Sequence, residues 1–289
     1  MRRLIIVVFL SLFCLAASAA VRGALFKVSA GGHSMYLFGT MHAGLPEFYP
    51  LEPRIANAVA ESATLALEID PAIDPAAAAS AMQKYAMARA GSVAPPALAK
   101  RLQKLLKKDG IDPASVAPLK PWMIATILVM HEFSRLGYRV DLAVDSELAK
   151  MARAGKAKVI SLESLDSQMA LFDSLSEKEQ WRFLANTVEL IESGKSGAEA
   201  RQLATAWSQA DQPALDALAR SVETDNTVSG RFMREVLLDG RNGALADKLQ
   251  LLLAKEDKAV AAIGVLHLLG KRGVPELLRA RGIDVERVY

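Results

Sequence analysis

Six short apolar segments of strand type, separated by two long helix-forming stretches, constrain the fold of this sequence most strongly. They lie at residues 25–29, 34–39, 64–70, 158–162, 259–264 and 284–288. The first two flank Gly31 and Gly32 and predict an N-terminal β-hairpin. Helical insertions are predicted at about residues 76–154 and 164–255. Strands at both ends and in the middle, with helices between them, predict an α/β (α+β) fold with a central mixed sheet.

The N-terminus has the charged, apolar and small-residue order of a secretory signal peptide. Arg2 and Arg3 precede an apolar run at residues 4–15, and small residues follow up to Ala20. The alternative is an uncleaved anchor, which needs roughly 17–25 apolar residues, more than this run supplies. We therefore expect a signal peptide at residues 1–19 and a single domain at residues 20–289. The protein is then exported, periplasmic or secreted, with no stable membrane insertion after cleavage.

Composition narrows the chemistry of the mature chain. Cys14 is the only cysteine and lies within the predicted signal peptide, so the mature chain can form no disulfide, thiolate metal site or cysteine nucleophile. A hydrophobic content of 52% with 23% charged residues is typical of a globular protein. The formal charge of +3 gives no reason to expect a nucleic-acid partner.

Two Gly-x-x-His sequences follow predicted strands. Gly39 precedes His42 and Gly264 precedes His267, in a chain with only four histidines. In open α/β sheets, ligands bind beyond the C-terminal ends of the strands. Two imidazoles at that edge could bind a divalent metal or transfer protons. Taken singly, each would more often be a hydrogen-bonded structural histidine than a ligand.

Two glutamates end other apolar segments. Glu68 follows Leu67 in an apolar string, where burying a carboxylate requires a metal, a cation or hydrogen bonds. The alternative is that strand alternation turns Glu68 to solvent. Glu163 has the same placement after Leu162, but it could instead begin the next helix as an N-terminal carboxylate.

Arg241 and Asn242 follow Gly240 at a predicted interruption of the second helical stretch. An arginine near two histidines and a glutamate could bind a substrate carboxylate or stabilise an oxyanion. By itself it would be a surface arginine.

These segments together resemble the TraB/GumN family, which is Tiki-like and whose wider fold is similar to that of the erythromycin-esterase-like superfamily. The resemblance covers nearly all of the mature chain in order: residues 25–42, 48–51, 67–70, 155–168, 237–242 and 264–282. Two positions depart from the family pattern. Gly240 stands where an acidic residue is usual before the arginine, which could loosen its placement. Ala143 stands where a glycine often precedes the aspartate matched by Asp145.

The resemblance implies an active site at His42, Glu68, Arg241 and His267. Its Tiki branch implies metal-dependent peptide hydrolysis, whereas other branches are linked to pheromone shutdown or polysaccharide gene clusters without a settled reaction. We expect His42, His267 and Glu68 to bind a divalent ion (manganese, cobalt or zinc) that activates water for attack on a peptide or small-molecule substrate. Glu68 could be a ligand or the general base, and the other candidate catalytic residues are Glu163, Arg241 and Asn242. The alternative is a non-catalytic peptide- or pheromone-binding or regulatory protein that uses the same pocket.

Overall fold

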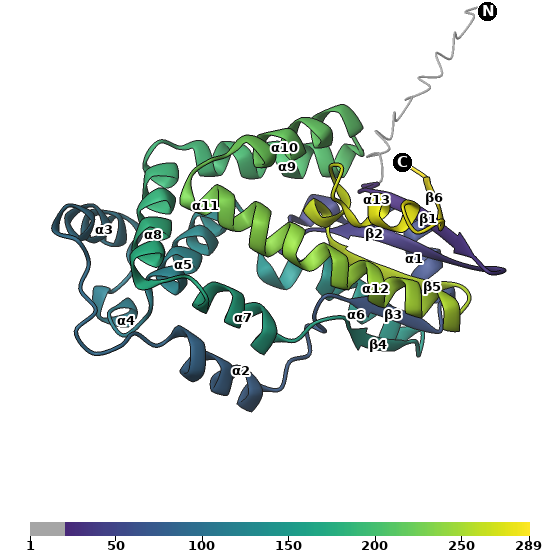
Figure 1. The fold of residues 1–289 in the computed structure, drawn as a ribbon, viewed down its shortest axis with the longest axis horizontal. Helices are drawn as coiled ribbons and strands as arrows, with labels where there is room; N and C mark the ends of the chain where they lie inside the picture. The colour runs from purple at the N-terminus through teal and green to yellow at the C-terminus, as the bar shows by residue number, and fades with distance from the viewer. Residues whose placement is uncertain (1–20) are drawn as a thin grey trace, which may run out of the picture.

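The computed structural model describes residues 21–289, so the predicted signal peptide lies outside the described residues. The described chain combines one six-stranded mixed sheet with many helices (Figure 1). This arrangement confirms the predicted α/β class.

The sheet has the strand order β4-β3-β5-β2-β1-β6. β1 (Leu25–Ala30) and β2 (His33–Thr40) form the predicted antiparallel hairpin, and Gly31 and Gly32 supply its turn with φ angles of 60° and 84°. β6 (Asp284–Arg287) pairs antiparallel with β1. β2, β5 (Ala259–Gly264), β3 (Thr64–Leu67) and β4 (Lys158–Ser161) pair parallel in that order. Four strands therefore end at the same edge of the sheet.

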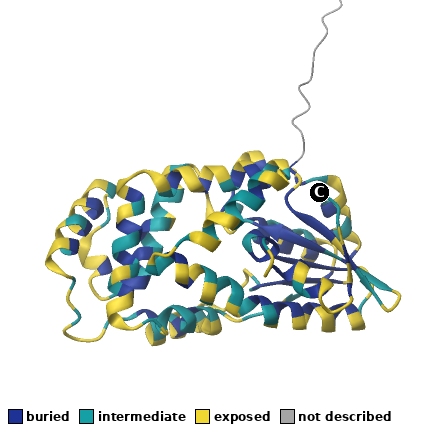
Figure 2. Ribbon diagram, turned by 45° about the horizontal axis from the view of Figure 1, so that its top comes forward, coloured by how far each residue is buried: buried dark blue, intermediate teal, exposed yellow. Residues whose placement is uncertain are grey.

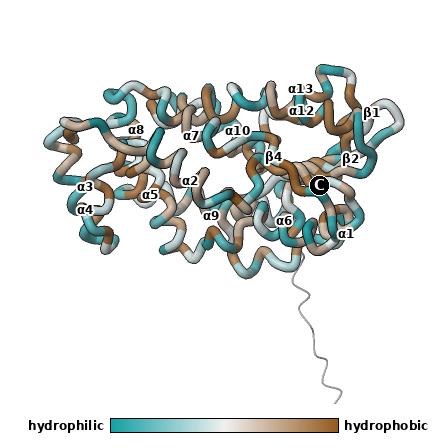
Figure 3. Tube along the Cα trace, turned by 90° about the horizontal axis from the view of Figure 1, so that it is seen from below, coloured by the Kyte–Doolittle hydropathy of each residue, from teal (hydrophilic) through white to brown (hydrophobic). Residues whose placement is uncertain are grey.

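Helices cover both faces of the sheet. Figure 3 shows α12 (Gly240–Lys255) and α13 (Val274–Arg279) on one face, and α1 (Pro53–Glu61) and α6 (Val144–Ala154) on the other. The central strands β3 and β5 are buried along their whole length, which explains their unbroken apolar sequences. Figure 2 shows this burial concentrated in the sheet and on the inner faces of the helices.

The remaining helices form a second body beside the sheet (Figure 1). Its first part contains α2 (Pro75–Ala81), η2 (Met82–Ala86), α3 (Pro96–Asp109), α4 (Pro113–Val116) and α5 (Pro121–Arg135). Its second part contains α7 (Leu165–Asp173), α8 (Glu177–Glu192), α9 (Lys195–Gln209), α10 (Gln212–Thr224), α11 (Val228–Arg231) and the π-helix η4 (Phe232–Asp239). Short 3₁₀ turns lie at η1 (Pro46–Phe48), η3 (Val140–Leu142) and η5 (Val265–Leu268).

The two predicted helical insertions meet in this body. α5 packs along α8, where Leu128, Leu184 and Val188 share one apolar core. The last helix of each predicted insertion lies elsewhere, because α6 and α12 pack on the sheet. Within residues 21–289, no helix has the length and apolar character needed to cross a membrane.

Candidate functional site

The parallel strands bring the predicted site residues to one edge of the sheet. β2 ends at Thr40, two residues before His42, and β5 ends at Gly264, three residues before His267. Glu68 directly follows β3, which lies between β4 and β5. Residues distant in sequence thus converge because their strands are neighbours.

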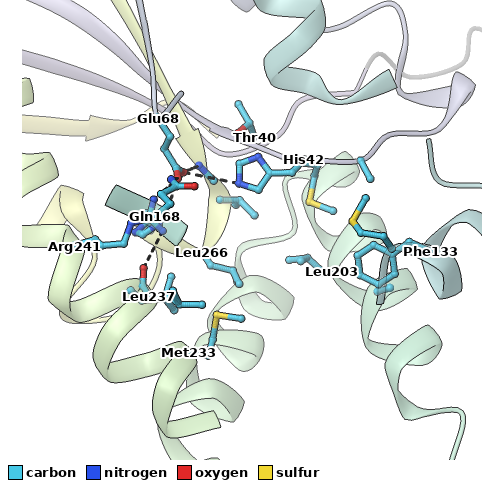
Figure 4. A pocket seen from close by; sticks show the side chains of 18 of the residues that line it. Thr40, His42, Glu68, Phe133, Gln168, Leu203, Met233, Leu237, Arg241 and Leu266 are labelled. Carbon is cyan, nitrogen blue, oxygen red and sulfur yellow. Dashed lines mark hydrogen bonds and ion pairs between the residues drawn. The ribbon is translucent and has the colours of Figure 1, made fainter. Parts of the chain in front are cut away.

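Glu68 is the centre of the site and is only 5% exposed. Its Oε1 accepts a hydrogen bond of 2.5 Å from the backbone N–H of Gly264. The same oxygen lies 4.0 Å from Nε2 of His42 and 3.9 Å from Nε2 of His267. Its Oε2 accepts hydrogen bonds from Gln168, at 3.2 Å, and from Nη2 of Arg241. The buried carboxylate is therefore fully partnered, and one of its oxygens lies near both imidazoles. Figure 4 shows Glu68 and His42 facing each other.

His42 is anchored through its other ring nitrogen. Its Nδ1 lies 2.8 Å from Oδ2 of Asp145, and Oδ1 of Asp145 accepts a hydrogen bond of 2.7 Å from Thr40. Asp145 is buried at the start of α6, which packs against β3 and β4. A carboxylate acceptor requires a proton on Nδ1, which orients Nε2 towards Glu68.

His267 is anchored in the same way by a neutral partner. Its Nδ1 donates to Oδ1 of Asn242 at 2.5 Å, and Nδ2 of Asn242 donates to the carbonyl of Arg272 at 2.8 Å. Both His267 and Asn242 are buried. The amide oxygen can only accept, so Nδ1 carries the proton and Nε2 of the neutral ring keeps its lone pair.

Arg241 links the two predicted glutamates. Its Nε donates to both carboxylate oxygens of Glu163, at 3.0 and 3.1 Å. Its Nη2 donates to Glu163 and to Glu68, and its Nη1 donates to the carbonyl of Leu237 at 3.1 Å. Four of its five N–H groups are thus engaged within the protein. The glycine at position 240 does not leave this arginine loosely placed.

Charge and burial set the protonation states of the metal-free site. Burial disfavours the charged ring of His42, but the adjacent Asp145 outweighs it and raises the pKa of His42 to about 9. The His42 side chain is nevertheless 65% exposed to the cavity, so its burial is less complete than that of its neighbours. Burial likewise acts against ionised Glu68, but His42, His267 and Arg241 hold its pKa at about 2. Burial lowers the pKa of His267 to about 4, so this ring is neutral at pH 7.

The donor set suits a divalent metal ion. Imidazole nitrogens and carboxylate oxygens bind such ions at roughly 2.0–2.2 Å, so two ligands of one tetrahedral ion lie about 3.5 Å apart. Oε1 of Glu68 lies 4.0 and 3.9 Å from the two Nε2 atoms, so the side chains would have to close slightly on a bound ion. Among residues 21–289, no three His, Cys, Asp or Glu side chains are already gathered tightly enough to hold an ion. The chemistry of the set fits, with Asp145 and Asn242 in the supporting positions.

Sequence reasoning placed Asn242 in the site but missed three of its polar residues: Thr40, Asp145 and Gln168. The available signal for Asp145 was an acidic residue directly after buried Val144 at the start of a helix. Gln168 lies one turn into α7 and reaches both Glu68 and Glu163, at 3.2 and 2.9 Å. A glutamine on an amphipathic helix carries no comparable signal.

The site opens into a cavity of about 340 Å³ between the sheet edge and the helical body. Its polar lining residues are those of the site together with Tyr138. Its remaining walls are mostly apolar and come from α5, α7, α9 and η4 (Figure 4). These wall residues are Met130, Phe133, Leu171, Phe172, Ala200, Leu203, Met233, Leu237 and Leu238.

Comparison with known proteins places most of the chain in a family. YbaP, an uncharacterized protein of Escherichia coli (strain K12), is 26% identical over 249 residues, which cover 86% of this chain and 89% of YbaP. YbaP of Shigella flexneri matches with the same identity and coverage. No solved structure matches this chain. The model of the TraB/PrgY/gumN family matches residues 24–287, and the chain therefore belongs to the TraB/PrgY/gumN family.

Proposed function

We propose that this protein is a metal-dependent hydrolase that acts on peptide bonds. The observation that carries the proposal is the convergence of two anchored imidazoles on one oxygen of Glu68, at the polar end of an otherwise apolar cavity. Burying charged groups is costly unless they are paired, and a paired cluster with strongly shifted pKa values in a cavity is typical of a functional site. The family match spans the segments that carry these residues.

His42, His267 and Glu68 would hold the ion. When bound, a divalent ion lowers the pKa of a coordinated water and polarises a carbonyl group. Asp145 and Asn242 fix the two rings so that both Nε2 atoms face the same place. Gln168 and Arg241 fix the Glu68 carboxylate, which leaves Oε1 as the oxygen directed at the rings.

The electrostatics favour the ligand role of Glu68 over the general-base role. An efficient general base has a pKa near the working pH. Glu68 is held at about 2 by the charges around it, far below neutrality. A carboxylate that stays ionised is suited to holding a cation.

Arg241 acts in this proposal mainly through Glu68. Its N–H groups are largely engaged by the two glutamates and by Leu237, and its side chain is only 12% exposed. We therefore assign it a positioning role in place of a direct contact with a substrate carboxylate. Export through the signal peptide at residues 1–19 is part of the same proposal, and mass spectrometry of the mature N-terminus tests it.

A binding role without catalysis is the second candidate. The observation that favours it is that the polar groups of the site are already satisfied by one another, so the cavity offers mainly apolar surface. A capture protein for an apolar peptide requires no more than this.

The deciding experiment is digestion of a peptide library by the mature protein, with and without added manganese, cobalt or zinc. We expect metal-dependent cleavage that His42→Ala, Glu68→Gln and His267→Ala each abolish. The matched control is His33→Ala, because His33 lies at the far end of the hairpin strand and contacts the carbonyl of Leu253. Peptide binding without cleavage under any metal, weakened by His42→Ala, would establish the binding role instead.

A further inference from the structure

The cavity beside the site is divided chemically into two parts. One end carries His42, Glu68 and Arg241, whereas the walls carry thioether, aliphatic and aromatic groups. In Figure 4, Met233 and Leu237 project from one side of the cavity, and Leu203 and Phe133 project from the other. A ligand that reaches the polar end must therefore pass between two apolar walls.

The charged groups that line the cavity have little capacity left for a charged ligand. Four of the five N–H groups of Arg241 are engaged, and both oxygens of Glu68 accept hydrogen bonds. His42 is paired with Asp145 through Nδ1, and its Nε2 stays open at the polar end of the cavity. A terminal ammonium or carboxylate placed against these walls would lose its hydration without gaining a counter-ion.

Two of the wall residues are unusually exposed for their type. Met130 and Met233 are 36% and 37% exposed, and they are among the few large hydrophobic residues exposed in residues 21–289. They come from α5 and η4, which approach the cavity from different parts of the chain. Apolar surface left open around a pocket marks a binding site, and methionine adapts to ligands of varied shape.

We infer that the cavity selects its substrate by a large uncharged side chain, such as that of leucine, methionine or phenylalanine, next to the scissile bond. This inference rests on the proposed function and specifies its substrate class. A volume of about 340 Å³ is near the lower limit for ligand pockets and suits one or two side chains better than a long acyl chain. Lysine, arginine, aspartate and glutamate are excluded at that position.

The test separates binding from cleavage. Acetylated and amidated pentapeptides that differ only in the central residue are titrated into the EDTA-treated protein by calorimetry, and their cleavage is then followed with metal restored. Affinity should rise roughly fourfold for each added methylene from alanine to leucine. Peptides with central lysine or glutamate should bind at least a hundredfold more weakly than the leucine peptide.

Two wall variants should redirect this preference. Leu203→Glu should favour the lysine peptide, and Met233→Lys should favour the glutamate peptide. Met233→Lys is included in case Leu203→Glu fails to fold, because Met233 is already partly exposed and should tolerate a charged residue. Leu251→Glu is the matched control, since Leu251 is 58% exposed and lies outside the cavity lining.

The outcomes distinguish this inference from the proposed function. If the protein binds apolar peptides preferentially and the wall variants reverse this preference, but no peptide is cleaved, the result would support selection of an apolar side chain by the cavity and would overturn the hydrolase. Cleavage with equal efficiency for leucine and lysine peptides would overturn the inference and leave the hydrolase intact. Displacement of a bound fluorescent fatty acid by fatty acids, with no peptide binding, would overturn the inference in favour of an acyl ligand.

Discussion

Nε2 of His267 lies 3.9 Å from Oε1 of Glu68, and the backbone N–H of Gly264 donates to that same oxygen. The two residues follow neighbouring parallel strands, β5 and β3, in the middle of the sheet. Their relationship is therefore set by strand pairing, and the helices add the groups that orient them.

Gly264→Ala should impair activity without unfolding the protein. A Cβ at this position would lie 3.1 Å from both Oε1 of Glu68 and Nε2 of His42, so one of them must move. The shift needed is a few tenths of an ångström, and because a displacement of about 1 Å can cost roughly a hundredfold in rate, we expect a loss of up to about tenfold. Kinetics and circular dichroism measure the effect. Gly243→Ala is the control, because its Cβ meets nothing within 4 Å and should slightly stabilise α12. Full activity in Gly264→Ala would contradict the packing described here.

Asn242→Ala should lower both stability and metal affinity. It leaves Nδ1 of buried His267 without its acceptor, which costs about 1–3 kcal/mol in unfolding free energy. Loss of such a supporting group typically costs roughly 10–100-fold in metal affinity. Asn242→Asp keeps the acceptor and should retain more of both. Urea unfolding and metal titration test this, with exposed Asn226→Ala as the control. Equal metal affinity in wild type and Asn242→Ala would count against the anchoring role.

Much of this site could be predicted from the sequence because its residues directly follow apolar strands. Each of these apolar runs ends at a glycine or a charged residue, namely Gly39, Gly264 or Glu68. The hairpin could also be predicted, because Gly31 and Gly32 separate two segments with strand character.

The supporting residues could not be placed in this way. Asp145 and Gln168 lie on helices, where acidic and amide side chains are common on exposed faces. Only the packing of α6 and α7 near the sheet edge directs them to His42 and Glu68. The same reason explains why α6 and α12 looked like parts of the insertions although they cover the sheet.

Arg241→Met should destabilise the protein markedly. It leaves the carboxylates of Glu68 and Glu163 without their shared cation, and breaking a buried ion pair costs about 3–5 kcal/mol. The double variant Arg241→Met, Glu163→Gln should regain part of the lost free energy of unfolding, because it has one unpaired negative charge fewer. A double-mutant cycle in urea measures this coupling. Exposed Arg101→Met, which breaks the pair with Glu192, should change stability by no more than about 1 kcal/mol. Strict additivity at the buried pair would refute the coupling.

The metal-free protein should lose stability on acidification between about pH 6.5 and pH 2. The pKa of His267 is lowered from 6.5 to about 4, and that of Glu68 from 4.5 to about 2. Both groups bind protons less readily in the folded state than in the unfolded state. Each therefore contributes its full stabilisation above its unfolded pKa and loses it as the pH falls through its folded pKa. The Glu68 contribution is on the order of 3 kcal/mol.

Thermal unfolding across this range in EDTA measures the effect. Glu68→Gln should be less stable at pH 7 but should show a flatter dependence below pH 4.5, since it removes the group that titrates there. If Glu68→Gln and the wild type lose stability equally steeply below pH 4.5, other carboxylates control acid unfolding.

Titration with cobalt(II), followed by visible absorption, tests the proposed metal site most directly. The wild-type protein should bind one ion per chain with a saturable signal, and His42→Ala, Glu68→Gln and His267→Ala should each lose it. His33→Ala and His131→Ala should retain it, because neither residue lines the cavity. Absence of saturable binding in the wild type, or binding that survives loss of His42 and His267, would contradict a metal centre at these residues.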